Sequence, residues 1–315
     1  MAATRVLDAF APDVVDAVRA IAEEVERESG VAPFGAGTWA GLTGNSVLGD
    51  RGVLVTDDTA MPVAYAHVAH HHDDEWSVEI AAVAGHLDDV PRLLALATEV
   101  VAAAGGGHVT LWAHGATTAA DARASAAGFV PERDLLQLRV PLPLPTPTTW
   151  PADVRVRTFR PGEDDDGWLG VNNRAFAGHP EQGDWTHDHL RHREKEDWFD
   201  PAGFLVAFDD EGMAGFCWTK IHPADPPREP DALGEIYVIG ADPRWHGRGL
   251  GRALTSGGLE SLAQRGVTVG MLYVDGANAA AVGLYHALGF TEHRVDRAYG
   301  RTVAPTMAPT ADSGP

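Results

Sequence analysis

The chain repeats part of its own sequence on either side of a proline-rich segment. Five prolines favour an extended, semi-rigid backbone there, at positions 141, 143, 145, 147 and 151. The stretch from Leu111 to Phe129 aligns without a gap on the stretch from Leu272 to Phe290. We interpret this match as an internal duplication. The sequence therefore predicts two copies of the same fold, with the prolines between them.

Each copy alternates helical and extended patterns, which predicts an α/β architecture. A chain of 315 residues is also long enough for two domains that each bury a core. We therefore expect a first domain over residues 1–142, a linker over 143–151 and a second domain over 152–301. Residues 302–315 are small, polar and proline-bearing, so we expect a disordered tail.

Charge and cysteine content restrict the partners. The formal net charge of -21 disfavours nucleic acid and anionic membranes, so we expect a small-molecule substrate and no nucleic-acid or membrane partner. Cys217 is the single cysteine, which excludes an intramolecular disulfide and fits a reducing compartment. There is no signal-like start and no run of eighteen apolar residues, so a cytoplasmic location is predicted.

A glycine-rich run follows an apolar strand pattern in the second copy. Ile236 to Gly240 is followed by Arg244-Trp-His-Gly-Arg-Gly-Leu-Gly-Arg252, which predicts a strand, a turn and a helix start. Glycines remove side chains where backbone N–H groups converge, and a helix start directs its positive end toward them. The run therefore predicts a cradle for a pyrophosphate. It is neither the dinucleotide GxGxxG pattern nor a P-loop, because no Lys-Ser/Thr pair closes it.

This run resembles the R/Q-x-x-G-x-G/A signature of GNAT acetyltransferases, and the second copy resembles that family over nearly its whole length. The resemblance implies two tandem GNAT domains, each with a mixed, mostly antiparallel sheet in which a splayed parallel strand pair is flanked by helices. It also implies acetyl-CoA as co-substrate. The implied acetyl-CoA contacts are Ile239, Gly240, Ala241, His246, Gly247, Arg248, Gly249, Leu250, Gly251, Arg252, Asn278, Ala279, Ala280, Ala281, Val282 and Gly283. For Asn278, a plain helix N-cap is the competing interpretation.

Two residues suit the proton transfers that acetylation of an amine requires. Tyr285 lies in the segment Leu-Tyr-His-Ala-Leu-Gly-Phe, where the resemblance implies a tyrosine that acts as general acid toward the CoA sulfur. A phenol with a pKa of ~10 can donate a proton at neutral pH without being ionised beforehand. Glu235 stands on a predicted strand, where a carboxylate could accept the amine proton. The structural alternatives are a core aromatic residue for Tyr285 and a solvated strand-end carboxylate for Glu235.

Further segments narrow the resemblance. Residues Asn172 to Trp185, Gly215 to Pro223 and Leu233 to Gly240 look like those of mycothiol synthases. That family consists of tandem GNAT enzymes of actinobacteria, which acetylate the cysteine amine of cysteinyl-glucosaminyl-inositol. By position, the acceptor contacts that this resemblance implies are Glu181, Lys220, Glu235 and Tyr273. Carboxylates and an ammonium group suit an acceptor with many hydroxyl groups.

The first copy departs from the second where the chemistry is expected. The segment of the first copy that corresponds to the glycine-rich run is Leu87 to Leu93. It has no glycine and carries two carboxylates that would repel a pyrophosphate. Gly35 and Ala36 stand near the position where the family has an acidic acceptor contact. The alignment matches Asn278 with Thr117, Tyr285 with Ala124, Lys220 with Val68, and Glu235 with Glu79. One active copy, the second, is therefore predicted.

Two alternatives stay open from the residues alone. A tandem GNAT enzyme could acetylate another amine, such as an aminoglycoside or a protein N-terminus. A non-catalytic acyl-CoA-binding sensor is the second alternative, and the presence of both Glu235 and Tyr285 speaks against it. We expect a monomer. No metal is predicted, since His187, His189 and His192 lack the i, i+4 spacing of a helical ligand pair.

Overall fold

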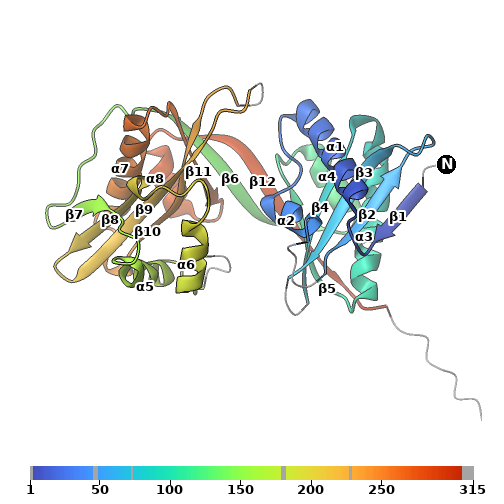
Figure 1. Cartoon of the computed structure of the whole chain (residues 1–315), viewed down its shortest axis with the longest axis horizontal. Coiled ribbons are helices and arrows are strands. Elements are labelled where there is room, and N and C mark those ends of the chain that lie inside the picture. Colours follow the sequence, from blue (N-terminus) through green and yellow to red (C-terminus); the bar gives the residue numbers. More distant parts are fainter. Residues whose placement is uncertain (1–2, 45–48, 72–73, 179–181, 227–228, 307–315) are drawn as a thin grey trace, which may run out of the picture. The chain divides into compact units, whose positions relative to one another are not determined.

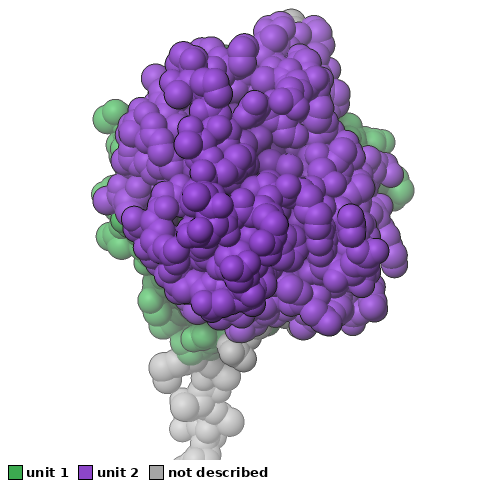
Figure 2. All heavy atoms as spheres, turned by 90° about the vertical axis from the view of Figure 1, so that its left-hand side faces the viewer, with its two compact units in different colours: residues 1–135, 275–277, 294–315 green, residues 136–274, 278–293 purple. Residues whose placement is uncertain are grey.

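The computed structural model describes residues 3–44, 49–71, 74–178, 182–226 and 229–306. The chain divides into two compact units, which Figure 2 distinguishes by colour. Unit 1 takes in residues 1–135, 275–277 and 294–315, and unit 2 takes in residues 136–274 and 278–293. Each unit combines one sheet with helices and has its own buried cores.

Unit 1 is a mixed sheet with helices packed on both faces (Figure 1). Its strands lie in the order β1, β2, β3, β4, β5, β12, and β4 and β5 are parallel. Along β2, Val53 and Val55 join the core beneath α3, whereas Leu54 joins the core beneath α1. The elements are β1 (Ala3–Leu7), α1 (Pro12–Ser29), α2 (Ala36–Leu42), β2 (Arg51–Thr56), β3 (Pro62–His70), β4 (Glu75–Ala82), the 3-10 helix η1 (Ala84–Asp89), α3 (Val90–Ala103), β5 (Gly107–Ala113), α4 (Thr118–Ala126) and β12 (Thr291–Val303).

Unit 2 has the same layering. Its strands lie in the order β6, β11, β10, β9, β8, β7, with β10 and β11 parallel. Alternate residues of β9 point to opposite faces. Trp218 therefore enters an aromatic core beneath α5 and α6, and Cys217 enters an aliphatic core beneath α7 and α8. The elements are β6 (Val130–Pro141), β7 (Arg155–Thr158), α5 (Asp165–Ala175), α6 (His187–Glu194), the 3-10 helix η2 (Pro201–Gly203), β8 (Phe204–Asp209), β9 (Gly212–His222), β10 (Leu233–Ala241), the 3-10 helix η3 (Pro243–Trp245), α7 (Leu250–Gln264), β11 (Val269–Asp275) and α8 (Ala279–His286).

The last strand of each sequence copy belongs largely to the other copy's unit. Residues 136–141 of β6 lie in unit 2 beside β11, and residues 294–303 of β12 lie in unit 1. There β12 pairs with β5 from Arg297 opposite Ala113 to Val303 opposite Gly107. The units therefore differ from the division at residues 143–151 that the prolines predicted. The reason is that pairing between distant strands decides which unit a strand joins, and the sequence of a single strand does not show its partner.

The described end of the chain also differs from the prediction. Disorder was expected from residue 302, but Thr302 and Val303 complete β12 with backbone pairing to β5. Residues 307–315 of the predicted tail lie outside the described residues.

Candidate active site

The parallel strands β10 and β11 separate halfway along their length. They pair at three positions only, Leu233 with Val269, Gly234 with Gly270 and Glu235 with Met271. Past Glu235 a register shift between Ile236 and Val238 bends β10, which stays paired with β9 as far as Ala241. Ile239, Gly240 and Ala241 therefore keep one edge of their backbone unpaired with β11. Such an edge offers N–H and C=O groups to a ligand inserted between the strands.

The glycine-rich run forms the turn that the sequence predicts. Gly247 and Gly249 have φ values of 73° and 85°, a left-handed conformation that other residues rarely adopt. Gly249 is the N-cap of α7 and has no side chain to cover the first amides of the helix. A Cβ atom placed on Gly247, Gly249 or Gly251 would have no neighbouring atom within 4 Å. The turn thus presents the start of α7 uncovered, which is the geometry that binds phosphate groups.

A recess borders this turn. Its volume is about 200 Å³, and Gly249, Arg252 and Ser256 line it together with residues 144–147 of the proline-rich segment. Arg248 and Arg252 are both exposed, and the guanidinium of Arg248 lies 3.8 Å from the ring centre of Trp245. Two cations thus flank the uncovered helix start.

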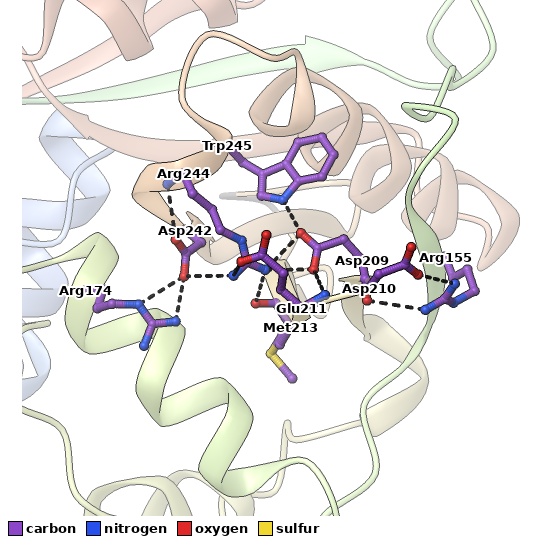
Figure 3. A network of polar contacts seen from close by, with 9 residues as sticks. All are labelled: Arg155, Arg174, Asp209, Asp210, Glu211, Met213, Asp242, Arg244 and Trp245. Carbon is purple, nitrogen blue, oxygen red and sulfur yellow. Dashed lines mark hydrogen bonds and ion pairs between the residues drawn. The ribbon is translucent and has the colours of Figure 1, made fainter.

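Arg244, the first residue of the glycine-rich run, is held by carboxylates (Figure 3). Its guanidinium donates to both oxygens of Asp209 at 2.9 Å. Trp245 donates its indole N–H to the same carboxylate at 2.6 Å. On the other side, Asp242 accepts the backbone N–H of Arg244 at 3.1 Å and two hydrogen bonds from Arg174 of α5. The turn is therefore fixed to the end of β8 and to α5.

Helix α8 begins with small residues. Asn278 is its N-cap, and the side-chain oxygen accepts from Ala281 N at 3.1 Å, so the capping interpretation holds for that atom. Ala279, Ala280 and Gly283 are exposed, whereas Ala281 and Val282 pack partly against the aliphatic core. The exposed face at the start of α8 therefore carries only very small side chains.

Tyr285 lies at the buried side of α8. Its ring packs in the aliphatic core of unit 2 together with Cys217, which pairs across the strands with Ile239 of the open edge. Burial, with a smaller effect of nearby Cys217, raises the pKa of Tyr285 to about 12. The hydroxyl is therefore protonated at neutral pH, as a general acid must be before it reacts.

Glu235 stands at the last paired position of β10, where the two strands begin to separate. Its side chain is only 11% exposed, and Oε2 lies 2.7 Å from Nε2 of His222. Directly across the antiparallel pair lies Lys220. Sequence reasoning found Glu235 and Lys220 but not His222. The two-residue period of β9 places Lys220 and His222 on one face of that strand, but the contact of His222 with Glu235 depends on the register of β9 and β10.

The ammonium of Lys220 lies over two aromatic rings. Its Nζ is 4.7 Å from the ring centre of Trp198 and 5.9 Å from that of Tyr237. Such contacts hold a lysine side chain in place without neutralising its charge. Tyr237 follows Ile236 at the register shift, and burial raises its pKa above the usual range.

The other two predicted acceptor contacts are less well defined by the structure. Tyr273 on β11 is 36% exposed, and its hydroxyl accepts from the side-chain amide of Gln137 at 2.6 Å. It lies two residues beyond Met271, the partner of Glu235. Glu181 lies outside the described residues.

Unit 1 holds the counterpart of Glu235 in a closed network. Glu79 accepts from the hydroxyl of Thr38 at 2.5 Å and lies 2.7 Å from Nε2 of His114. The other ring nitrogen of His114 lies 3.3 Å from Asp296. Burial alone would lower the pKa of His114, but its contacts with Asp296 and Glu79 raise that pKa to about 9. A carboxylate held by an imidazolium and a hydroxyl is a poor proton acceptor.

Strand register corrects one alignment between the copies. Glu79 pairs with His67 on β3, just as Glu235 pairs with Lys220 on β9. The counterpart of Lys220 is therefore His67 and not Val68. His67 is buried and bonded to Asp50 at 3.0 Å, so it presents no cation to solvent. At the position in unit 1 that corresponds to the glycine-rich turn, the chain forms the 3-10 helix η1, in which no residue has the left-handed conformation.

Comparison with known proteins identifies the family. A family model described as the acetyltransferase (GNAT) family matches residues 172–290, a range that contains Glu235, the glycine-rich turn and Tyr285. The mycothiol acetyltransferase of Thermobispora bispora is 44% identical over 292 residues, which cover 92% of this chain and 97% of that protein. The chain belongs to the mycothiol acetyltransferase family. The member of this family from Thermomonospora curvata is 41% identical, with 93% of this chain and 95% of that protein covered. The chain is accordingly an acetyltransferase, as the sequence predicted.

Solved structures confirm the fold class. A GCN5-related N-acetyltransferase from Sphaerobacter thermophilus matches with a TM-score of 0.75 at 22% identity, over 97% of both chains. A tandem GNAT protein from the clavulanic acid biosynthesis pathway matches with a TM-score of 0.69 at 15% identity, over 97% of this chain and 100% of that one. At these identities the likeness shows the fold alone, and that fold is the predicted tandem GNAT architecture.

Among the described residues, no three His, Cys, Asp or Glu side chains are grouped so that they could hold a metal ion. Within the same part of the chain, no helix combines the length and the hydropathy needed to span a membrane.

Proposed function

We propose that this acetyltransferase uses acetyl-CoA to acetylate the cysteine amine of cysteinyl-glucosaminyl-inositol, the last step of mycothiol biosynthesis. Unit 2 carries the catalysis and unit 1 is catalytically silent. The observation that carries the proposal is the position of Glu235, opposite Lys220, at the point where β10 and β11 separate. Membership in the mycothiol acetyltransferase family supports the choice of acceptor.

The residues around the strand opening fit acetyl-CoA. The open edge at Ile239 to Ala241 offers backbone groups for the amides of the pantetheine arm. The uncovered start of α7, with Arg248 and Arg252 beside it, suits a pyrophosphate. The small residues Ala279 to Gly283 leave room for the arm to lie against α8. Acetyl-CoA would supply the activated acetyl group.

Glu235 removes the proton of the attacking amine. A cysteine α-amine has a pKa near ~8, so only part of the acceptor needs deprotonation at neutral pH. The carboxylate is mostly buried, which strengthens its attraction for a cationic amine. Once the amine is neutral, its lone pair forms the new C–N bond and the bond between carbonyl carbon and sulfur breaks. The nitrogen then loses its second proton, which replaces the proton that Tyr285 gives to the sulfur.

Tyr285 supplies a proton to the departing CoA sulfur. Its hydroxyl is protonated at neutral pH, since burial raises its pKa to about 12. Lys220 and Tyr273, together with Glu181, bind the hydroxyl groups of the acceptor. The ammonium of Lys220 is directed by Trp198 and Tyr237, and this fixes where an acceptor oxygen can be bound.

The test is CoA release from acetyl-CoA by the purified full-length protein. The acceptors are cysteinyl-glucosaminyl-inositol, glucosaminyl-inositol without the cysteine, an aminoglycoside and a peptide with an unmodified N-terminus. A kcat/KM at least about 100-fold higher for the first acceptor is expected, which corresponds to about 2.7 kcal/mol of discrimination. Equal or higher kcat/KM with another amine would reject this acceptor, and no release with any of the four would reject the proposed activity.

A further inference from the structure

Among the described residues, the polar side chain that contacts the Glu235 carboxylate is His222. The distance from Oε2 of Glu235 to Nε2 of His222 is 2.7 Å. Lys220 lies directly across the strands, but no ion pair joins it to Glu235 in the described part of the chain, because its ammonium lies against Trp198. The carboxylate is thus coupled to an imidazole rather than to a permanent cation.

Burial differs sharply between the two partners. The side chain of Glu235 is 11% exposed, and that of His222 is 35% exposed. His222 lies at the last position of β9, opposite Leu233, where the strand pair ends. The imidazole therefore connects a nearly buried carboxylate with the solvent at the end of the strand.

A nearly buried base has a difficulty that an exposed base does not have. Each turnover leaves one proton on Glu235, and that proton must leave before the next amine can be deprotonated. With an acceptor bound over it, the carboxylate has still less contact with water. An imidazole is suited to carry the proton away, since one ring nitrogen can accept while the other can donate.

We infer that His222 takes the amine proton from Glu235 and releases it to solvent. The inference rests on the proposed function, in which Glu235 is the base. The neutral imidazole accepts the proton of the Glu235 carboxyl at Nε2 and becomes an imidazolium, and the carboxylate is restored. The imidazolium then loses a proton to water, so no proton and no charge accumulates at the site. His222 does not touch the acceptor; it is a positioning residue that acts through Glu235.

Two substitutions separate proton transfer from simple support of the carboxylate. His222→Gln can still hydrogen-bond Glu235 but cannot carry a proton. His222→Ala removes the ring and leaves space for imidazole added to the buffer. His108→Gln in unit 1 is the matched control, because His108 also contacts a carboxylate, Glu132 at 3.2 Å, and is 32% exposed.

We expect kcat for acetyl transfer to fall at least about tenfold in both His222 variants, less than the roughly 100-fold or more that loss of a general acid or base itself causes, because Glu235 remains. The KM for acetyl-CoA should stay within about twofold of the unaltered protein. Added imidazole should restore most of the lost kcat in His222→Ala and none in His222→Gln. His108→Gln should match the unaltered protein.

The outcomes are distinguishable. Full activity of His222→Gln would show that the side chain only orients Glu235 and would overturn the inference, while the proposed function would stand. A loss in His222→Ala that imidazole does not relieve would also overturn it. Thermal unfolding of each variant identifies misfolding. If His222→Ala is misfolded, the activity of His222→Gln tests the inference alone. If the unaltered protein acetylates no amine, the proposed function fails and this inference fails with it.

Discussion

The carboxylate of Asp209 binds Arg244 and Trp245 at the start of the glycine-rich run, and the shorter of these contacts is the 2.6 Å hydrogen bond from the indole N–H of Trp245. Asp209 ends β8 and is far from the turn in sequence. Its carboxylate is 12% exposed, and its pKa lies below the usual range because the hydrogen bonds from Trp245, Glu211 N and Arg244 outweigh the effect of burial. The start of the glycine-rich run is thus held by a charged residue from the end of another strand.

Asp209→Ala should therefore weaken acetyl-CoA binding without a change in the ligand-facing residues. The substitution leaves Arg244 without its main partner, and losing hydrogen bonds to a charged group costs about 1.5–3 kcal/mol. We expect the acetyl-CoA KM to rise roughly tenfold while the acceptor KM changes little. Asp210→Ala is the matched control, since Asp210 is 95% exposed and binds only Arg155 among the described residues. Equal acetyl-CoA KM values in the two variants would contradict the role of Asp209.

Tyr285→Phe tests the general acid. The ring packs in the core and only the hydroxyl is removed, so the fold should be retained. We expect kcat to fall by a factor of about 100 or more, the usual range for a general acid, with acetyl-CoA affinity nearly unchanged. Steady-state kinetics and equilibrium binding of acetyl-CoA check the two expectations separately. A variant that binds and turns over like the unaltered protein would remove Tyr285 from the mechanism.

Lys220→Ala tests the acceptor site. Removing the ammonium that rests on Trp198 should raise the acceptor KM roughly tenfold, since one charged hydrogen bond contributes about 1.5–3 kcal/mol. Acetyl-CoA binding should be unaffected. Lys195, the only other lysine, follows the end of α6, and Lys195→Ala serves as control. An unchanged acceptor KM in Lys220→Ala would refute the contact.

The network around His114 predicts a pH dependence of stability. The contacts with Asp296 and Glu79 outweigh burial and raise the pKa of His114 to about 9, whereas an unfolded histidine has a pKa of ~6.5. The folded state therefore binds the extra proton between these values, so its stabilising effect is complete below pH ~6.5 and is lost as the pH rises toward 9. The effect is on the order of 3 kcal/mol.

Urea unfolding measured from pH 6.5 to 9.5 checks this expectation. The free energy of unfolding of the unaltered protein should fall with rising pH more steeply than that of His114→Gln. His86→Gln is the control, because His86 is 32% exposed and contacts only Asp89 among the described residues. Parallel curves for the unaltered protein and His114→Gln would contradict the assignment.

The local features of the site could be predicted from the sequence. Glycines and a following apolar pattern define a turn and a helix start within the chain segment itself, and α7 begins in the predicted run, at Leu250. The placement of Glu235 on a strand before that turn is equally local. The roles of Glu235 and Tyr285 in catalysis remain predictions.

Features that depend on contacts between distant segments could not be predicted. His222 meets Glu235 only through the antiparallel register of β9 and β10, and a register is set by side-chain packing across strands. The counterpart of Lys220 was assigned to Val68 instead of His67 for the same reason. A shift of one residue in the register moves every side chain of a strand to the other face. Asp209 reaches Trp245 through tertiary packing, for which its sequence neighbourhood carries no signal.

The distribution of the terminal strands affects how this protein can be synthesised and shortened. Unit 1 needs residues 294–303 along β5, and a ribosome makes these residues after all of unit 2. Until then β5 has an uncovered edge, which is prone to pair with other chains. A gene fragment that begins after the first copy would lack β6 beside β11 and would carry β12 without its partner β5. The first copy therefore cannot be removed by simple truncation.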